Sequence, residues 1–214
     1  MTEQNLSPLG DSAITVTIGE GISEALSDKV VAEARAVADN QIPGVIDVVA
    51  SYASVTVHYD PLRIGYADLR SRLLSIDRTG SSTSNERSVT EHVIPVRYNG
   101  EDLEEVAQRT QLSTQAVIEI HSQRIYRVFV IGFVPGFAYL GVLDPRLVLP
   151  RRESPRKRVP AGSVAIAEAQ TGIYPTETPG GWHLIGTTHM RMFDPNRKDP
   201  ALFAVGDRVR FEPV

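Results

Sequence analysis

The spacing of apolar and polar positions predicts a small α+β unit in the N-terminal part of the chain. Residues 13–18 alternate between apolar and polar side chains, as expected for a half-buried strand. Residues 23–39 carry apolar side chains at helical spacing, and a serine opens this segment as a helix cap. A hairpin over 45–50 and 53–59, followed by a helix over 66–77, completes the order β-α-β-β-α. This order is typical of a ferredoxin-like domain that lacks its last strand.

A polar segment then separates this unit from the rest of the chain. Residues 78–87 (RTGSSTSNER) are rich in serine and have no apolar period, which indicates a linker. We therefore expect two domains, 1–87 and 88–214. A strand over 92–98 can close the first domain or open the second, and we assign it to the second because it follows the linker.

The second domain begins with helices and continues as short strands. Two short helices are followed by a nearly continuous apolar strand, YRVFVI. Further short strands are separated by Gly/Pro turns, a pattern that favours a β-barrel or sandwich. The predicted helices cover 101–109 and 113–122, and the predicted strands cover 126–131, 163–167, 182–186 and 207–213.

Glycine and proline are concentrated between residues 132 and 186. This quarter of the chain holds 8 of its 16 Gly and 7 of its 14 Pro, so its turns are closely specified. Rigid turns that carry aromatic and arginine side chains usually build a binding surface. We therefore look for the functional residues here.

Charge and composition narrow the class of protein. The 22 basic and 26 acidic side chains give a net charge of −4, which argues against a nucleic-acid partner. The chain has no cysteine, which excludes disulfides, thiol nucleophiles and Cys-ligated zinc and is compatible with a cytoplasmic location. The polar start of the chain does not resemble a secretory signal, and no apolar run approaches the ~20 residues of a membrane helix.

A basic cluster over residues 151–158 is the first candidate site. Arg151, Arg156 and Arg158 can grip a carboxylate or phosphate through paired guanidinium hydrogen bonds. The neighbouring prolines would hold these side chains in place. The alternative is a solvated loop in which Glu153 is a local partner.

Aromatic residues of the same region can form the wall of a pocket. Phe133, Phe137, Tyr139 and Tyr174 combine apolar faces with polar edges, and the turn at Pro135 and Gly136 would shape that wall. The alternative for these rings is the barrel core or an interface with another protein.

Histidine is the remaining candidate for proton transfer. His183 and His121 can each act as a general base, although a lone histidine is more often a hydrogen-bonded structural residue. We include His183 among the candidate site residues.

The chain lacks the motifs of a self-sufficient enzyme. It has no phosphate-binding loop, no G-x-G-x-x-G turn, no H-E-x-x-H and no G-x-S-x-G elbow. Its five histidines show no metal-ligand spacing with carboxylates, so we expect no metal and assign no catalytic residue. This combination indicates one part of a site that is shared with another protein.

Four long motifs carry a family resemblance. GFVPGFAYLG, PRRESPRKRVPAGSVAI, TGIYPTETPGGWHLIG and the closing GDRVRFEPV resemble the KipI / allophanate hydrolase subunit 1 family, many of whose bacterial members are B subunits of 5-oxoprolinase. The likeness extends through EHVIPVRYNGEDLEEVAQ to nearly the whole chain.

The resemblance implies a fold, partners and a reaction. It implies a cyclophilin-like β-barrel in the second domain, paired with a homologous C subunit of the allophanate hydrolase subunit 2 type. With an A subunit, the complex would use ATP to open the lactam of 5-oxo-L-proline and yield L-glutamate. This chain would contribute half of a shared site and be inactive alone. The missing phosphate-binding loop argues against ATP binding by this chain, and the sequence leaves open which subunit holds ATP.

Members of the family have other functions, and this chain differs from the usual family sequence at two positions. Its kinase-inhibitor member acts on a sensor histidine kinase, and its relatives in urea carboxylase work with biotin as a carboxyltransferase half, so both remain alternatives. Thr187 and His189 stand here where the family usually has arginine and proline, which leaves the substrate open.

Overall fold

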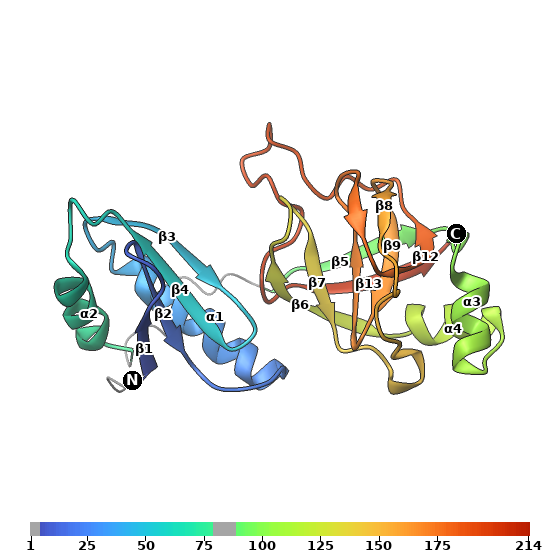
Figure 1. The fold of residues 1–214 in the computed structure, drawn as a ribbon, viewed down its shortest axis with the longest axis horizontal. Helices are drawn as coiled ribbons and strands as arrows, with labels where there is room; N and C mark the ends of the chain where they lie inside the picture. The colour runs from blue at the N-terminus through green and yellow to red at the C-terminus, as the bar shows by residue number, and fades with distance from the viewer. Residues whose placement is uncertain (1–4, 79–88) are drawn as a thin grey trace. The chain divides into compact units, whose positions relative to one another are not determined.

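The structure is a computed structural model that describes residues 5–78 and 89–214. It divides into two compact units, residues 1–88 and 89–214, each of which is described by itself (Figure 1). Apart from Arg78, the predicted linker lies outside the described residues. The predicted domain boundary therefore stays a prediction.

The first unit has a four-stranded sheet in the order β1-β2-β4-β3, in which every pair is antiparallel. Ser23 caps the first helix, where its Oγ accepts a hydrogen bond from the Leu26 backbone at 3.2 Å. The edge strand β1 was not predicted, because it has only three residues and one of them is buried. The elements are β1 (Leu6–Pro8), β2 (Ala13–Thr17), α1 (Glu24–Asp39), β3 (Val45–Ala50), β4 (Ser54–Tyr59) and α2 (Tyr66–Ser75).

One hydrophobic core holds this unit together. Val30 of α1 and Leu69 of α2 are fully buried in the same cluster as Ile14 and Val57 of the sheet. The predicted helices, hairpin and first strand are therefore confirmed as elements. The ferredoxin-like description of the unit stays a prediction.

The second unit is built mainly from strands. It begins with β5 (Glu91–Val96), α3 (Leu103–Thr110), α4 (Thr114–Ser122), β6 (Ile125–Ile131) and β7 (Ala138–Gly141). It continues with a 3-10 turn (Pro145–Leu147), β8 (Arg156–Val159), β9 (Ser163–Ala167), β10 (Gln170–Ile173), β11 (Thr178–Gly180), β12 (His183–Thr187) and β13 (Arg208–Pro213). The sequence did not predict β7, β8, β10 or β11, which are three or four residues long.

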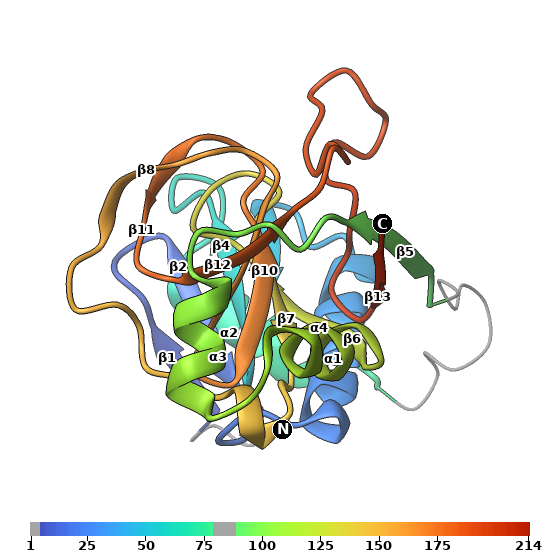
Figure 2. The ribbon, with the colours of Figure 1, turned by 90° about the vertical axis from the view of Figure 1, so that its right-hand side faces the viewer.

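Seven strands form a sheet that almost closes on itself. Their order is β12-β9-β10-β7-β6-β13-β5. Strand β5 lies beside β13 and runs parallel to it (Figure 2). The two edges of the sheet meet where the Arg97 backbone N–H donates to Thr187 O at 2.9 Å and the Thr187 N–H donates to Arg97 O at 2.8 Å. The expected barrel is therefore present as a nearly closed, barrel-like sheet.

Two smaller features position the site. Strands β8 and β11 form a separate antiparallel ribbon, which carries part of the basic cluster. Phe137, Tyr174 and Trp182 form a hydrophobic cluster of their own, distinct from the main barrel core. Within the described residues, no helix has both the length and the apolar character needed to cross a membrane.

Gly100 lets the start of α3 lie directly against β12. A β-carbon at Gly100 would collide with Leu184 O and the Ile185 backbone. The Asp102 N–H donates to Leu184 O at 2.9 Å across the same contact. Glycine is required here because the two backbones leave no room for a side chain.

We predict that Gly100→Ala lowers the free energy of unfolding by about 1–3 kcal/mol, because the added methyl group forces the α3 and β12 backbones apart. Urea unfolding followed by circular dichroism measures the change. Gly132→Ala is the control, since its new methyl group would have only Val130 Cγ1 nearby, at 3.9 Å. Equal unfolding free energies for Gly100→Ala and the wild type would contradict this account of the contact.

Candidate functional site

The structure brings the predicted aromatic residues together around Phe137. The buried Phe137 ring makes edge contacts with Phe133, Tyr139 and Tyr174 at centroid distances of 5.7, 4.9 and 5.3 Å. Trp182, which directly precedes β12, contacts Phe137 at 5.6 Å. Phe137, Tyr174 and Trp182 are buried and serve mainly in packing, whereas Phe133 keeps 61% of its surface exposed.

The turn before β7 fixes the exposed ring. Phe133 has φ +73°, a conformation that a bulky side chain adopts only when its surroundings hold it there. Gly136 has φ +82° and packs so closely on Met192 O and Phe193 that a side chain would not fit. Pro135 is exposed and Gly136 is buried, so these two residues shape the turn.

The two tyrosines keep their phenolic protons. Burial raises the pKa of Tyr139 and, more deeply in the cluster, that of Tyr174, while the charge of Arg151 acts in the opposite direction on both. Tyr174 packs against Gly180 of the ribbon. Both phenols are therefore hydrogen-bond donors at neutral pH, and Arg151 lies within electrostatic reach of each.

The three predicted arginines do not converge on one point. Arg151 pairs with Glu168 at 3.3 Å and Arg158 pairs with Glu177 at 2.8 Å, in both cases between largely exposed side chains. Arg156 turns the other way and binds Asp102 at 2.6 Å. Their part in binding a substrate stays a prediction.

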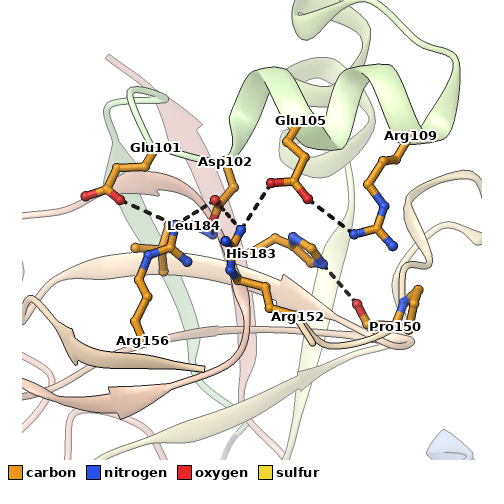
Figure 3. Close-up of polar contacts among 9 residues, drawn as sticks. All are labelled: Glu101, Asp102, Glu105, Arg109, Pro150, Arg152, Arg156, His183 and Leu184. Carbon is orange, nitrogen blue, oxygen red and sulfur yellow. Dashed lines mark hydrogen bonds and ion pairs between the residues drawn. The ribbon is translucent and has the colours of Figure 1, made fainter. Parts of the chain in front are cut away.

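Asp102 is the centre of a buried polar cluster that the sequence did not predict (Figure 3). Its Oδ1 accepts hydrogen bonds from Arg152 Nη1 at 2.7 Å and from Arg156 Nη2 at 2.6 Å. Its Oδ2 accepts the Leu184 backbone N–H at 2.7 Å. Asp102 is only 3% exposed and occupies the N-cap position of α3, yet its side chain does not cap that helix.

Acidic residues of α3 and its approach extend this cluster. Glu105 binds Arg152 at 3.1 Å and Arg109 at 3.3 Å, and Glu101 binds Arg156 at 3.3 Å. These carboxylates follow Gly100 in the run GEDLEE. The sequence signal for the cluster was therefore weak: an acidic start of a predicted helix and, about 50 residues later, a basic loop. Their pairing with arginines about 50 residues further along depends on the closed sheet.

His183 is held within the same cluster. It is fully buried, and its Nε2 donates to Pro150 O at 2.9 Å, so the neutral ring carries its proton on Nε2. Its Nδ1 has no hydrogen-bond partner among the described residues. This contact pattern makes His183 a structural or ligand-binding residue more readily than a solvent-accessible base.

His121 lies in the barrel core, away from solvent. Its Nε2 donates to Thr171 Oγ1 at 2.9 Å, because that hydroxyl itself donates to a carbonyl, and Tyr98 Oη donates to Nδ1 at 2.7 Å. Burial lowers the pKa of His121 to about 3. The neutral ring is stacked on Phe211 at a centroid distance of 4.6 Å, so the structural interpretation of His121 holds.

A groove of about 660 Å³ opens beside the Asp102 cluster. Glu105 and Arg109 of α3 line one side, and residues 150–154 line the other. The volume lies within the usual range for a small-molecule site. Across residues 5–78 and 89–214, no group of three histidine or acidic side chains could hold a metal ion.

The second unit combines a nearly closed, barrel-like sheet with a groove beside a buried cluster of paired arginine and acidic side chains. Residues 4–203 match the family model described as "Carboxyltransferase domain, subdomain C and D". The chain therefore belongs to this carboxyltransferase C and D family.

Relatives of known name span nearly the whole chain. A Bacillus subtilis protein, named as the B subunit of 5-oxoprolinase, is 41% identical over 220 residues, which cover 95% of this chain and 90% of the relative. A Haemophilus influenzae protein of the same name is 37% identical and covers 97% of this chain and 96% of the relative.

Solved structures extend the comparison. The crystal structure of TTHA0988 is 42% identical with a TM-score of 0.84, covering 94% of this chain. This chain spans only 40% of the length of TTHA0988. The Kluyveromyces lactis urea amidolyase has a TM-score of 0.75 at 17% identity over 98% of this chain and 15% of that protein, a likeness that shows the fold alone.

We predict that Asp102→Asn lowers the free energy of unfolding by about 3–5 kcal/mol, because it removes the one buried carboxylate that two partly buried guanidinium groups share and leaves them only the more exposed Glu101 and Glu105. Denaturant unfolding at pH 7 measures the loss. The control Glu177→Gln breaks the exposed pair with Arg158 and should cost no more than about 1 kcal/mol. Similar losses for the two variants would show that Asp102 has no special structural role.

We further predict that His121 makes the protein less stable in acid. Its folded pKa of about 3 lies below the ordinary 6.5, so the unfolded chain takes up the proton first as the pH falls. The contribution of His121 to the free energy of unfolding is therefore fully present above pH 6.5 and declines as the pH falls below this value. From pH 7 to pH 5, the wild type should lose about 2 kcal/mol more than His121→Gln in urea unfolding. Parallel pH profiles for the two proteins would exclude a buried neutral histidine.

Proposed function

We propose that this chain works in the cytoplasm as the B subunit of an ATP-dependent 5-oxoprolinase, with a homologous C subunit and an A subunit. The observation that carries the proposal is 41% identity to a protein named as the B subunit of 5-oxoprolinase over 95% of this chain. The same name recurs in a Haemophilus relative at 37% identity. Membership in the carboxyltransferase C and D family supports the same assignment.

The proposed reaction opens the five-membered lactam of 5-oxo-L-proline. The oxygen of a water molecule joins the lactam carbonyl carbon, the bond from this carbon to the ring nitrogen breaks, and the nitrogen takes up a proton. The product is L-glutamate. ATP activates the lactam by transferring its γ-phosphoryl group to the carbonyl oxygen and leaves as ADP. After water has added and the bond to the ring nitrogen has broken, a second water molecule releases the phosphoryl group as inorganic phosphate, so the lactam, ATP and two water molecules give L-glutamate, ADP and phosphate. The missing phosphate-binding loop favours another protein of the complex as the ATP-binding subunit.

This chain contributes binding groups to the site. Phe133 and Tyr139 form an apolar wall that excludes water from one face of the substrate ring. Arg151 lies within electrostatic reach of Tyr139 and Tyr174 and binds the substrate carboxylate, exchanging its exposed contact with Glu168 for this ligand. Arg156 remains a secondary candidate because the buried Asp102 holds it, and Arg158 remains one because it does not line the groove that Arg151 lines.

The partner protein completes the site. Phe133 is a large, exposed aromatic ring on a constrained turn, which suits contact with a second protein. In TTHA0988, the matching region is joined to a further three fifths of a longer chain. We propose that the C subunit covers this face and that this chain is inactive alone.

Finer fold descriptions belong to the same proposal. The barrel-like sheet is of the cyclophilin-like kind that the family resemblance implies. In the first unit, α1 connects β2 to β3 and α2 follows β4, and the three strands lie in the order β2-β4-β3. This arrangement supports a ferredoxin-like description.

Reconstitution tests the proposal directly. The chain is mixed with the homologues of the A and C subunits from the same genome, and L-glutamate release from 5-oxo-L-proline is measured with and without ATP. We expect release only with ATP and only with all three proteins. Glutamate release by this chain alone, or by the other two proteins without it, would overturn the proposal.

We predict that Arg151→Ala lowers kcat/KM of the complex at least about tenfold, because the substrate carboxylate loses its cation; tenfold corresponds to ~1.4 kcal/mol. Arg146→Ala is the matched control, since Arg146 also pairs with an acidic residue at the surface but lies outside the site. Equal kinetics for Arg151→Ala and Arg146→Ala would remove Arg151 from the site. Arg156→Ala is a poorer test because it also breaks the contact with Asp102.

A further inference from the structure

Three unpartnered nitrogens gather in one place. Arg152 Nε, Arg156 Nη1 and His183 Nδ1 are buried side-chain atoms without a hydrogen-bond partner, and they are the only such side-chain atoms in the described part of the chain. All three belong to the residues around Asp102 (Figure 3). Buried polar atoms are normally paired, so a cluster of exceptions calls for a physical explanation.

The chemistry of these atoms defines a complementary group. The two guanidinium nitrogens are N–H donors, and they need an oxygen acceptor. The His183 Nδ1 is an acceptor, because Nε2 carries the ring proton that is donated to Pro150 O. The missing partner therefore presents an acceptor oxygen next to an N–H donor.

The local charges favour a neutral partner. Arg109, Arg152 and Arg156 contribute three positive charges, which are matched by the carboxylates of Glu101, Asp102 and Glu105. An anion would upset this balance, and an ammonium group would leave the guanidinium donors unfilled. An uncharged amide offers both an acceptor oxygen and an N–H donor, and in a lactam the ring holds its carbonyl oxygen and N–H on the same edge.

The neighbouring groove offers a route to these atoms. Pro150 and Arg152 line the groove of about 660 Å³, and the same two residues contact His183 and Asp102. The Arg152 side chain is held by ion pairs and is partly exposed, whereas its backbone N–H is fixed to Gly181 O at 2.8 Å. Arg152 is the residue that the groove and the cluster share, so a ligand seated in the groove meets the cluster at this side chain.

We propose that the groove and the Asp102 cluster form a binding site for a small lactam or related cyclic amide, whose carbonyl oxygen accepts from Arg152 and Arg156 and whose N–H donates to His183. This inference rests on the proposed function and assigns the substrate's amide edge to named residues. Arg151 also lines the groove and offers a cation for the carboxylate of 5-oxo-L-proline.

A ligand series tests the inference without altering the protein. Calorimetry on the reconstituted complex, and on this chain alone, compares 5-oxo-L-proline with its N-methyl derivative and with L-proline. The first analogue lacks the N–H and the second lacks the carbonyl. We expect both analogues to bind at least about tenfold more weakly, because each leaves a buried nitrogen unpaired. Equal affinity for 5-oxo-L-proline and its N-methyl derivative, or no binding of any of the three compounds, would overturn the inference.

A conservative substitution tests the protein side. Arg152→Lys keeps the positive charge beside Asp102 but removes the Nε donor. We expect the Kd for 5-oxo-L-proline to rise about tenfold, and Arg146→Lys, at an exposed ion pair, to leave it unchanged. An unchanged Kd in Arg152→Lys would contradict the assignment.

The outcomes separate this inference from the proposed function. If the complex releases glutamate with ATP but does not discriminate against the N-methyl derivative, the proposed function stands and the amide site fails. If the lactam binds selectively but no ATP-dependent glutamate release occurs, the amide site stands and the proposed reaction fails.

Discussion

The structure of the second unit depends on one buried negative charge. Asp102 joins the start of α3 to the loop that carries Arg152, to the ribbon that carries Arg156 and to the backbone of β12. A buried carboxylate is strongly destabilising unless its oxygens are hydrogen-bonded. The loop, the ribbon and β12 therefore all have to be in their folded positions for the start of α3 to pack here. The close approach at Gly100 is part of the same requirement, because it brings the α3 backbone within reach of Leu184.

This arrangement divides the basic loop into two faces. Arg152 and Arg156 face the acidic residues at the start of α3, whereas Arg151 lies within electrostatic reach of Tyr139 and Tyr174. Arginines that are adjacent in sequence thus have different tasks. Arg152 and Arg156 hold the loop and the ribbon against α3, and Arg151 keeps only an exposed ion pair with Glu168.

The sequence predicted elements well where their apolar pattern was long. The helix after Ser23, the hairpin over 45–59 and strand β6 were all predicted, because the apolar pattern within each segment is enough to identify it. Strands β8 and β11 escaped notice, since each has three or four residues and is defined by pairing with a distant partner.

The candidate site was predicted in part for the same reason. The aromatic residues between 133 and 174 share one turn-rich region, and the structure groups them around Phe137. The pairing of Asp102 with Arg152 and Arg156 could not be predicted, because about 50 residues separate the acid from the arginines and only the folded sheet brings them together. The burial of His121 is likewise a property of the closed core.

The contact between Arg97 and Thr187 has a consequence for how this sheet can move. Every other neighbouring pair of strands is joined along a ladder, whereas these two edges share a single reciprocal pair of backbone bonds. The two edges of the sheet are held together along this line by that one pair of bonds. Local opening should therefore begin there, with a free energy far below that of global unfolding. Since β12 contains His183 and Leu184, opening along this line would loosen the strand that contacts Pro150 and Asp102, while β7, β6 and β13 keep their own ladders.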